Sequence, residues 1–231
     1  MARATDATRP AGRRAIGVRA GLNLKRIIEA ARSLDPDELT MQALAEELGV
    51  DRKALNHHVS DRETLLGLVA MDAFSEAFSA VHIAAHAQWQ EACRTYARGF
   101  TDSVIAAGVL ADRVRLSDPY VTSVLQPTEA VLKKLVEAGF DDEIAMRSLA
   151  LLTNICLAYA RDTVITARSG VSPRPLILRK ALGQRDPEEY EILVRIAALP
   201  VSTYDKAQLE LSIEVFISGT DAMLRRSKGL G

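Results

Sequence analysis

One stretch constrains the fold of this chain more than any other: TMQALAEELGVDRKALNHHV, residues 40–59. Its first half has apolar residues at i, i+3, i+4 and i+7, which predict one buried face of a short helix. These residues are Met41, Leu44, Ala45 and Leu48. Thr40 stands where a helix N-cap accepts a backbone hydrogen bond. Gly49 stands where helices end in a left-handed residue, which glycine adopts without steric cost. Two short helices joined by a tight turn are therefore predicted.

The flanking residues extend this pattern to a helix-turn-helix. Asp51 can cap the next helix, and Val50 and Leu55 have the spacing of a hydrophobic staple. A preceding helix is predicted by an apolar face of Leu24, Ile27, Ala31 and Leu34, and Asp35-Pro36-Asp37 should end it. Ser60 and Glu63 have the spacing of a capping box for a fourth helix. The first three helices would share one small core, with the tight turn at Gly49.

The second half of the stretch has a polar face whose chemistry suits DNA. Arg52, Lys53, Asn56 and His57 lie at i, i+1, i+4 and i+5, opposite Leu55. Arg and Lys reach guanine edges or phosphates, and Asn can form two hydrogen bonds with adenine. His58 lies at the boundary of this face and could donate to a phosphate. The alternative is a pair of short helices with a solvated outer face.

Charge is distributed unevenly along the 231 residues, although the net charge is only −1. Residues 1–34 carry eight Lys or Arg side chains against Asp6 and Glu29, a net charge of +6. Residues 63–231 carry 18 basic and 21 acidic side chains, a net charge of −3. A basic end on a slightly acidic body favours a nucleic-acid contact confined to that end. A solvated, disordered arm over residues 1–20 is the alternative, and that arm could add phosphate or minor-groove contacts through Arg13 and Arg14.

Composition excludes several other classes of protein. Hydrophobic residues make up 48% and charged residues 26% of the chain, as in globular proteins with a sizeable core. No apolar run is long enough to span a bilayer, and a signal peptide is not expected, so no membrane partner is predicted. The two cysteines, Cys93 and Cys156, are far apart in sequence. They favour neither a disulfide framework nor a cysteine zinc site, and they suit a reducing, cytoplasmic location.

The run LTMQALAEELGVDRKALNHHVSDRETLL, residues 39–66, resembles the DNA-binding domain of the TetR family of bacterial transcriptional regulators. The matching elements are Leu44-Ala45, Leu48-Gly49-Val50, Leu55-Asn56-His57-His58-Val59, Arg62 and Leu65-Leu66. Asn56 stands where the family often has Tyr, so Asn56 is expected to read a base. The predicted DNA contacts are Thr40, Gln42, Arg52, Lys53, Asn56, His57, His58 and Arg62. Of these, Thr40, Gln42, His58 and Arg62 are expected to hold phosphates.

The order of aromatic residues and apolar helices after residue 66 resembles the C-terminal domain of the tetracycline-repressor branch of that family. The resemblance implies an all-α homodimer that releases an inverted-repeat operator when a small molecule enters the C-terminal domain. The predicted division is a basic arm over 1–20, a helix-turn-helix domain over 21–66, and a helical-bundle domain for ligand binding and dimerisation over 67–231. The predicted pocket residues are Phe78, Trp89, Tyr96, Phe100 and Asn154, and their large apolar area with few charges predicts a mostly apolar organic effector that releases a repressor. Plain core packing is the alternative for the aromatic residues.

Further elements of the body are predicted from periodicity. Apolar patterns over about 142–168 and 205–226 indicate two long helices, which are expected to form a four-helix bundle with the same helices of a second subunit. Ile213 and Phe216 are expected at that interface. Pro119 should start a helix, and Pro127 should kink or interrupt it. Residues 169–186, rich in Gly and Pro, are predicted to form a mobile loop.

Two rival functions remain open. His82 and His86 have a spacing that can place two imidazoles on one metal ion, but no third ligand is evident. Phe78 occupies the position that a drug-chelating histidine has in tetracycline-binding relatives, so neither a metal nor another cofactor is predicted. An all-α enzyme would need a site assembled from scattered residues such as His86, Cys93 and Asp162. A ligand-sensing helical protein without DNA binding would not require the polar face of residues 52–57.

Overall fold

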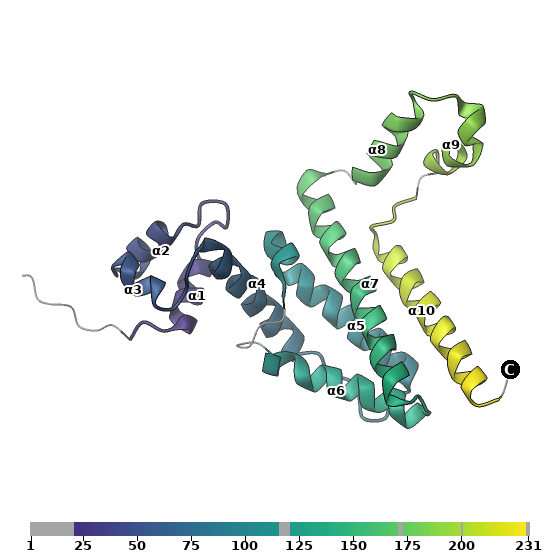
Figure 1. Ribbon diagram of the computed structural model, residues 1–231, viewed down its shortest axis with the longest axis horizontal. Coiled ribbons are helices and arrows are strands. Elements are labelled where there is room, and N and C mark those ends of the chain that lie inside the picture. Colours follow the sequence, from purple (N-terminus) through teal and green to yellow (C-terminus); the bar gives the residue numbers. More distant parts are fainter. Residues whose placement is uncertain (1–20, 116–120, 171–172, 200, 230–231) are drawn as a thin grey trace, which may run out of the picture.

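The computed structural model describes residues 21–115, 121–170, 173–199 and 201–229, and all regular structure in those ranges is helical (Figure 1). The all-α prediction is therefore confirmed. Three short helices form an N-terminal unit, the head, over residues 21–66. These helices are α1 (Leu24–Arg32), α2 (Met41–Leu48) and α3 (Arg52–Asn56). The predicted basic arm and the predicted helix start at Pro119 lie outside the described residues.

The head folds around the apolar residues that the sequence pattern selects. Ile27, Leu44 and Leu55 are completely shielded from solvent. The Thr40 hydroxyl accepts a hydrogen bond from the Ala43 amide at 3.0 Å, and the Asp51 carboxylate accepts one from Lys53 at 2.7 Å. Gly49 ends α2 with φ 65° and ψ 31°, a left-handed conformation in which a Cβ would be strained. Both predicted caps and the predicted turn are confirmed.

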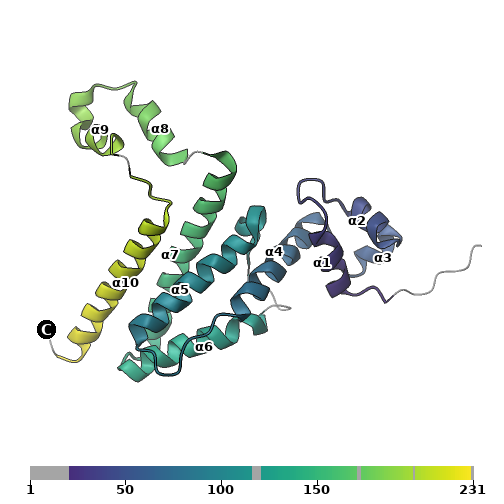
Figure 2. The ribbon, with the colours of Figure 1, turned by 180° about the vertical axis from the view of Figure 1, so that it is seen from behind.

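The body surrounds α5 and joins the head through α4. Its helices are α4 (Arg62–Ser79), α5 (Trp89–Ala106), the 3-10 helix η1 (Gly108–Arg113), α6 (Val121–Ala138), α7 (Asp142–Ser169) and α10 (Lys206–Ser227). α5 packs against α4, α6, α7 and α10. In both ribbon views α10 runs beside α7 on the side farthest from the head (Figures 1 and 2). Both long helices agree with the predicted ranges.

α4 begins differently from the predicted capping box. Its N-cap is Asp61, whose carboxylate accepts a hydrogen bond from the Thr64 amide at 2.8 Å, and Ser60 instead donates to Asp61 at 2.7 Å. The Thr64 backbone bond lowers the pKa of Asp61 below its ordinary value. Asp61 is the N-cap in place of Ser60 because its carboxylate accepts the hydrogen bond from the amide and also interacts favourably with the positive end of the helix dipole.

Two segments with proline or glycine differ from the predictions. Pro127 does not interrupt its helix, because α6 continues through this buried residue, and tertiary packing offsets the missing backbone hydrogen bond. Residues 169–186 do not form one loop, because α8 (Pro173–Leu182) occupies most of them. Its prolines lie in the first turn, where a missing N–H costs nothing.

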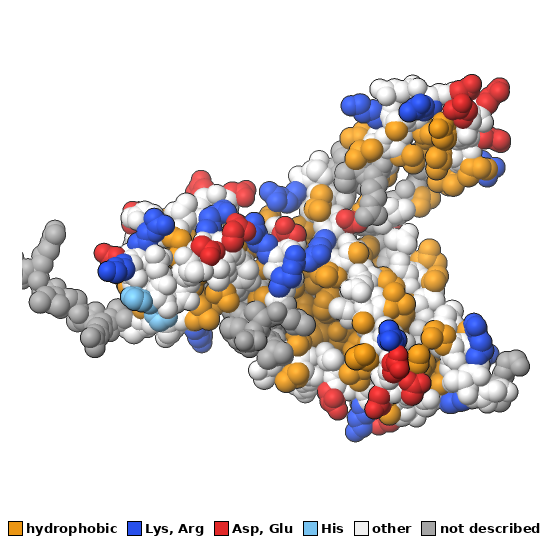
Figure 3. All heavy atoms as spheres, viewed as in Figure 1, with side chains coloured by type: hydrophobic (Ala, Val, Ile, Leu, Met, Phe, Trp, Pro, Cys, Tyr) orange, Lys and Arg blue, Asp and Glu red, His pale blue; other side chains and the backbone are white. Residues whose placement is uncertain are grey.

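α8 continues into the 3-10 helix η3 (Pro187–Tyr190) and α9 (Glu191–Ala197), forming an outer hairpin over residues 173–199. The hairpin joins the end of α7 to the start of α10 and projects beyond the body (Figure 1). None of its described side chains is buried, and Figure 3 shows hydrophobic side chains gathered on it. Among the described residues, no helix combines the length and apolar character that a membrane span needs.

Candidate functional site

The exposed face of α3 consists of the polar side chains that the sequence selects. Arg52, Lys53, Asn56 and His57 are all exposed, while Leu55 on the opposite side is fully buried. Asp51 caps the helix start, and the helix ends at Asn56 with His57 as its C-cap. His57 therefore stands at the end of the helix, and His58 lies in the following turn. The burial of Leu55 sets the rotation of α3 and so presents its polar face to solvent.

Two of the predicted phosphate contacts lie at the surface of α2. Thr40 is exposed, and because its oxygen accepts the Ala43 amide, its O–H hydrogen remains available as a donor. The Gln42 amide donates to Glu46 at 2.8 Å on the outer side of the same helix. The exposed side chains of Thr40, Gln42 and His58 thus border the α3 face.

Arg62 has a different place from the one predicted. Its Nε donates to the Leu39 carbonyl at 2.6 Å, and a terminal nitrogen donates to the Pro36 carbonyl at 2.8 Å. The side chain is half-buried and holds the segment between α1 and α2 against the start of α4. Two of its donor groups are thereby occupied within the protein. Sequence spacing gives no indication of which carbonyls lie nearby, so this internal clamp was not predicted, and the phosphate contact of Arg62 stays a prediction.

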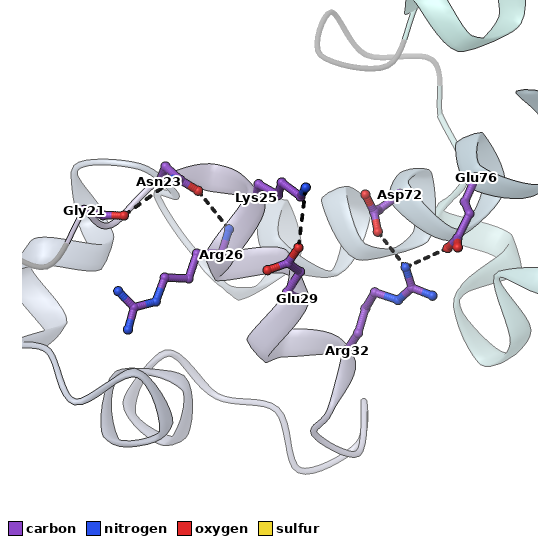
Figure 4. Close-up of polar contacts among 8 residues, drawn as sticks. All are labelled: Gly21, Asn23, Lys25, Arg26, Glu29, Arg32, Asp72 and Glu76. Carbon is purple, nitrogen blue, oxygen red and sulfur yellow. Dashed lines mark hydrogen bonds and ion pairs between the residues drawn. The ribbon is translucent and has the colours of Figure 1, made fainter.

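A second arginine fastens the head to α4 (Figure 4). One terminal nitrogen of Arg32, at the end of α1, donates to Asp72 and to Glu76 at 2.9 Å each. The hydrogen bond with Glu76 is the largest cause of the raised pKa of Arg32. Asp72 and Glu76 are both on α4, one turn apart, so one guanidinium group spans both. Movement of α4 relative to the body would therefore be passed to the head.

A cavity of about 720 Å³ lies in the body between α4, α5, α6 and α7. Four of the five predicted pocket residues line it: Phe78, Tyr96, Phe100 and Asn154. The Phe78 ring lies 5.5 Å from Tyr96 and 5.6 Å from Phe100, both edge-on. The Tyr96 hydroxyl shares a hydrogen bond with Thr153 at 3.3 Å, and burial raises the pKa of Tyr96. The wall is apolar with few polar groups, as small-molecule sites usually are.

Trp89 is the exception among the predicted pocket residues. Its ring packs edge-on against Phe140 at 5.3 Å, and it does not line the cavity. Trp89 is the first residue of α5, whereas Tyr96 and Phe100 follow two and three turns later. Helical spacing places these aromatic residues on related faces, but only the surrounding helices decide which of them border the cavity.

Two charged residues that were not predicted from the sequence, Arg115 and Arg161, line the same cavity. Arg161 stands in the otherwise apolar pattern of α7, LAYARDTV, and this interruption was the available signal. Arg115 follows η1, and no local pattern marks it. Both guanidinium groups approach the main-chain carbonyl of Asp112, at 2.7 Å for Arg115 and 3.5 Å for Arg161.

The residues of the rival functions are not arranged for those functions. α4 ends at Ser79, so His82 and His86 lie in the exposed segment before α5 and do not share a helix face. No group of three His, Cys, Asp or Glu side chains within the described ranges could hold a metal ion. Cys93 and Cys156 are buried free thiols, and burial raises their pKa values to about 12 and about 11. Neither supplies a thiolate near neutral pH.

The chain is similar to several solved structures over most of its length. No protein-family model matches it, and no curated protein does either. ActR of Streptomyces coelicolor, a TetR family protein in complex with actinorhodin, is 25% identical, with a TM-score of 0.69 over 88% of this chain and 97% of that one. A possible TetR family transcriptional regulator from Streptomyces coelicolor A3(2) is 21% identical, with a TM-score of 0.68 over 86% and 98%. A TetR variant from Acinetobacter baumannii AYE in complex with minocycline is 17% identical, with a TM-score of 0.59 over 88% and 98%.

Proposed function

We infer that this chain, which has the fold of TetR-family transcriptional regulators, is a ligand-responsive DNA-binding regulator. One observation carries the inference: a helix-turn-helix head with an exposed polar α3 face is fastened to a helix that also lines a largely apolar cavity. That helix is α4, which holds Arg62 and Asp72 at the head and Phe74 and Phe78 at the cavity. A ligand that shifts α4 would therefore change the position of the DNA-reading surface.

The proposed DNA contacts divide into base-reading and phosphate-binding groups. Arg52, Lys53, Asn56 and His57 lie on the face of α3 that can enter the major groove. The bordering side chains of Thr40, Gln42 and His58 are proposed to contact phosphates. The head itself, residues 21–66, carries six basic and nine acidic side chains. We therefore propose that residues 1–20, with five Arg and only Asp6 as an acid, supply much of the phosphate neutralisation.

Dimerisation is proposed through α7 and α10. Leu211, Val215, Gly219 and Met223 form an exposed stripe along α10 at four-residue intervals. Leu151, Ala158 and Ile165 form a second exposed stripe along α7 at seven-residue intervals. Two adjacent apolar stripes of this length are typical of a helical interface. Ile213 and Phe216, which were expected at the interface, instead point into the body and are buried within one subunit.

A two-fold dimer presents two α3 helices, so the operator is proposed to be an inverted repeat. The effector is proposed to be a small organic molecule in the 720 Å³ cavity. This agrees with the ligands present in the similar structures, actinorhodin with ActR and minocycline with TetR. Because Phe78 and the neighbouring aromatic rings form the wall, binding is proposed not to require a metal ion.

η1 supports the proposed coupling between cavity and head. It packs against α4, α5 and α7, and Arg113 at its end forms an ion pair with Glu63 in the first turn of α4. Arg168, near the end of α7, also lies 3.9 Å from Asp37 of the head. A ligand lowers DNA affinity only to the extent that it binds one arrangement of these contacts better than the other.

The regulator function is tested by titrating the purified protein with its own upstream DNA and with a scrambled duplex of equal length. We expect tight binding to the upstream DNA and weak, strongly salt-dependent binding to the scrambled duplex. Equal binding to both at every salt concentration would contradict the proposal. We propose that the chain is not an enzyme, since the buried, protonated Cys93 thiol removes the only cysteine of the alternative site.

A further inference from the structure

The cavity joins an aromatic wall to a cationic end. Phe78 stacks on Phe74 with ring centroids 5.2 Å apart, and Phe100 and Tyr96 close the same cluster. In contrast to these apolar rings, Arg115 and Arg161 are charged. Both line the same cavity, and both approach the Asp112 carbonyl. Two guanidinium groups that share one acceptor oxygen must lie close to each other. The cavity therefore concentrates positive charge at one place.

The hydrogen bonds of these two arginines all go to main-chain carbonyls, and the nearby carboxylate of Asp112 acts on Arg161 only through its charge. Arg115 donates only to the main-chain carbonyls of Asp112 and Val114. Arg161 makes one long hydrogen bond, and its Nε is buried without a partner. By contrast, Arg94 and Arg98 on α5 each hold a glutamate of α10 with two hydrogen bonds. Arg115 and Arg161 thus differ from the arginines that fasten α10 to α5, because their hydrogen bonds go only to main-chain carbonyls.

Leaving two like charges together and partly out of water is unfavourable. Burial is the largest cause of the lowered pKa of Arg161, and the charge of Arg115 lowers it further, whereas the Asp112 carboxylate offsets only part of this effect. A guanidinium group in this state gains most from an anion, because planar carboxylates accept paired hydrogen bonds from arginine. An anionic ligand would satisfy the free Nε of Arg161 and also reduce the repulsion between the two side chains.

We propose that the cavity binds an aromatic organic acid, with its anionic group between Arg115 and Arg161 and its ring system against Phe78, Tyr96 and Phe100. The amide of Asn154 lies on the same cavity wall and is available for hydroxyl or carbonyl substituents of the ligand, whereas the Thr153 hydroxyl already donates to the Leu149 carbonyl. The proposal names the chemical class of the effector and in that respect rests on the proposed regulatory function. Binding of the acid itself does not depend on that function.

The position of Arg115 gives this recognition a consequence for the head. Arg115 also lines a second depression of about 430 Å³, between η1 and the start of α4, together with Glu63, Gly67 and Arg113. It follows Arg113, the partner of Glu63, by only two residues. An anion that draws Arg115 into the cavity would pull on η1 and on the Arg113–Glu63 ion pair. A charged effector would thus change the contact between η1 and the start of α4, where the body meets the head.

The test compares a carboxylate with its neutral amide. N-phenylnaphthylamine, a neutral fluorescent probe, reports cavity occupancy, and naphthoate and naphthamide compete with it. We expect the wild-type protein to bind naphthoate at least tenfold more tightly than naphthamide, as a hydrogen-bonded charge contributes. The Arg115→Gln/Arg161→Gln variant should lose this preference while it keeps the affinity for naphthamide. Arg225→Gln, which removes an exposed arginine paired with Asp221 on α10, should change neither.

Three results would overturn the proposal: failure of naphthoate to displace the probe, equal binding of acid and amide by the wild-type protein, or an unchanged preference in the double variant. If the double variant no longer binds the probe, Arg161→Gln alone decides, because Arg161 makes only one long hydrogen bond. DNA titrations without any probe separate this proposal from the regulator function. A protein that prefers naphthoate but ignores its upstream DNA disproves regulation only, whereas one that binds DNA but shows no acid preference disproves the acid site only.

Discussion

The head and the outer hairpin both consist of short helices, but only the head buries its apolar side chains. Ile27, Leu44 and Leu55 of the head are fully buried, and each helix start has a side-chain cap. In the hairpin, Leu176 and Ile177 are each more than half exposed, and none of the described side chains is buried. The head therefore buries its apolar side chains and caps its helices within one chain. The hairpin, by contrast, leaves a large apolar surface exposed to solvent.

This difference indicates which parts of the molecule need a second copy. The hairpin joins α7 to α10, and the exposed stripes of Leu151 and Val215 run along those two helices. The hairpin, on which hydrophobic side chains gather (Figure 3), is thus attached to both helices of the proposed dimer interface. We predict that the head folds identically in monomer and dimer, and that the apolar side chains of the hairpin are covered only in the dimer.

The largest expected effect comes from breaking the dimer. Val215→Asp places a charge in the exposed α10 stripe, where burial against a partner would be costly. Sedimentation should show a monomer, and operator affinity should fall by about a hundredfold or more, because the two heads no longer bind together. Trypsin should also cleave faster after Arg179 and Lys180 of the hairpin, while the head stays protected. The matched control is Val136→Asp, on an exposed position of α6, and a monomer from that variant would count against the assigned interface.

The next prediction compares how much a buried residue of the head and an exposed residue of the hairpin contribute to the free energy of unfolding of one chain. On the monomeric Val215→Asp background, Leu55→Ala should reduce the free energy of unfolding by about 2–5 kcal/mol, since it leaves a cavity in the head core. On the same background Leu176→Ala should change it by about 0.5 kcal/mol or less, since Leu176 is exposed. Urea titration followed by circular dichroism measures both. Similar losses from the two variants would mean that the hairpin is packed without a partner.

A smaller effect is expected at the reading surface of the head. Asn56→Ala should weaken operator binding by about 1–3 kcal/mol and relax the preference at one base position, because Asn56 is exposed on the polar face of α3. Arg62→Ala should instead lower the stability of the head, since Arg62 holds the Pro36 and Leu39 carbonyls. Binding titrations against single-base operator variants, with melting curves for both proteins, distinguish the two roles. Equally weakened binding of Arg62→Ala to every sequence, with a flatter salt dependence and an unchanged melting temperature, would restore its predicted phosphate contact.

The smallest effect concerns the attachment of α10 to the body at low pH. Hydrogen bonds from Arg98 and Arg94 lower the pKa values of Glu210 and Glu214 below the ordinary value of 4.5. A lowered carboxylate pKa stabilises the fold above the ordinary value, and that contribution disappears as the pH falls through the lowered value. The difference in unfolding free energy between wild type and Arg94→Gln/Arg98→Gln should therefore shrink between pH 6 and about pH 3. A constant difference would show that packing, and not charge, holds α10 there.

The sequence predicted features that depend on nearby residues better than features that depend on packing between distant segments. The caps at Thr40 and Asp51, the turn at Gly49 and the buried face of α10 depend on neighbours within one or two helical turns, and all were predictable. α8 was missed because its opening prolines are compatible with a first helical turn as well as with a loop. Pro127 was misjudged because packing around α6 outweighs a local penalty.

The sequence by itself determined the helical class, the helix-turn-helix and the exposed chemistry of α3, because each depends on spacing along a single helix and on short-range capping. Only the tertiary structure decided that Arg62 clamps carbonyls of Pro36 and Leu39, that Trp89 packs on Phe140, and that Arg115 meets Arg161 in the cavity. Arg115 and Arg161 are far apart along the chain, and a charge-bearing cavity exists only once η1 and α7 pack together. Spacing along a helix determines which way a side chain faces, but the partner it meets depends on contacts that close long loops of chain.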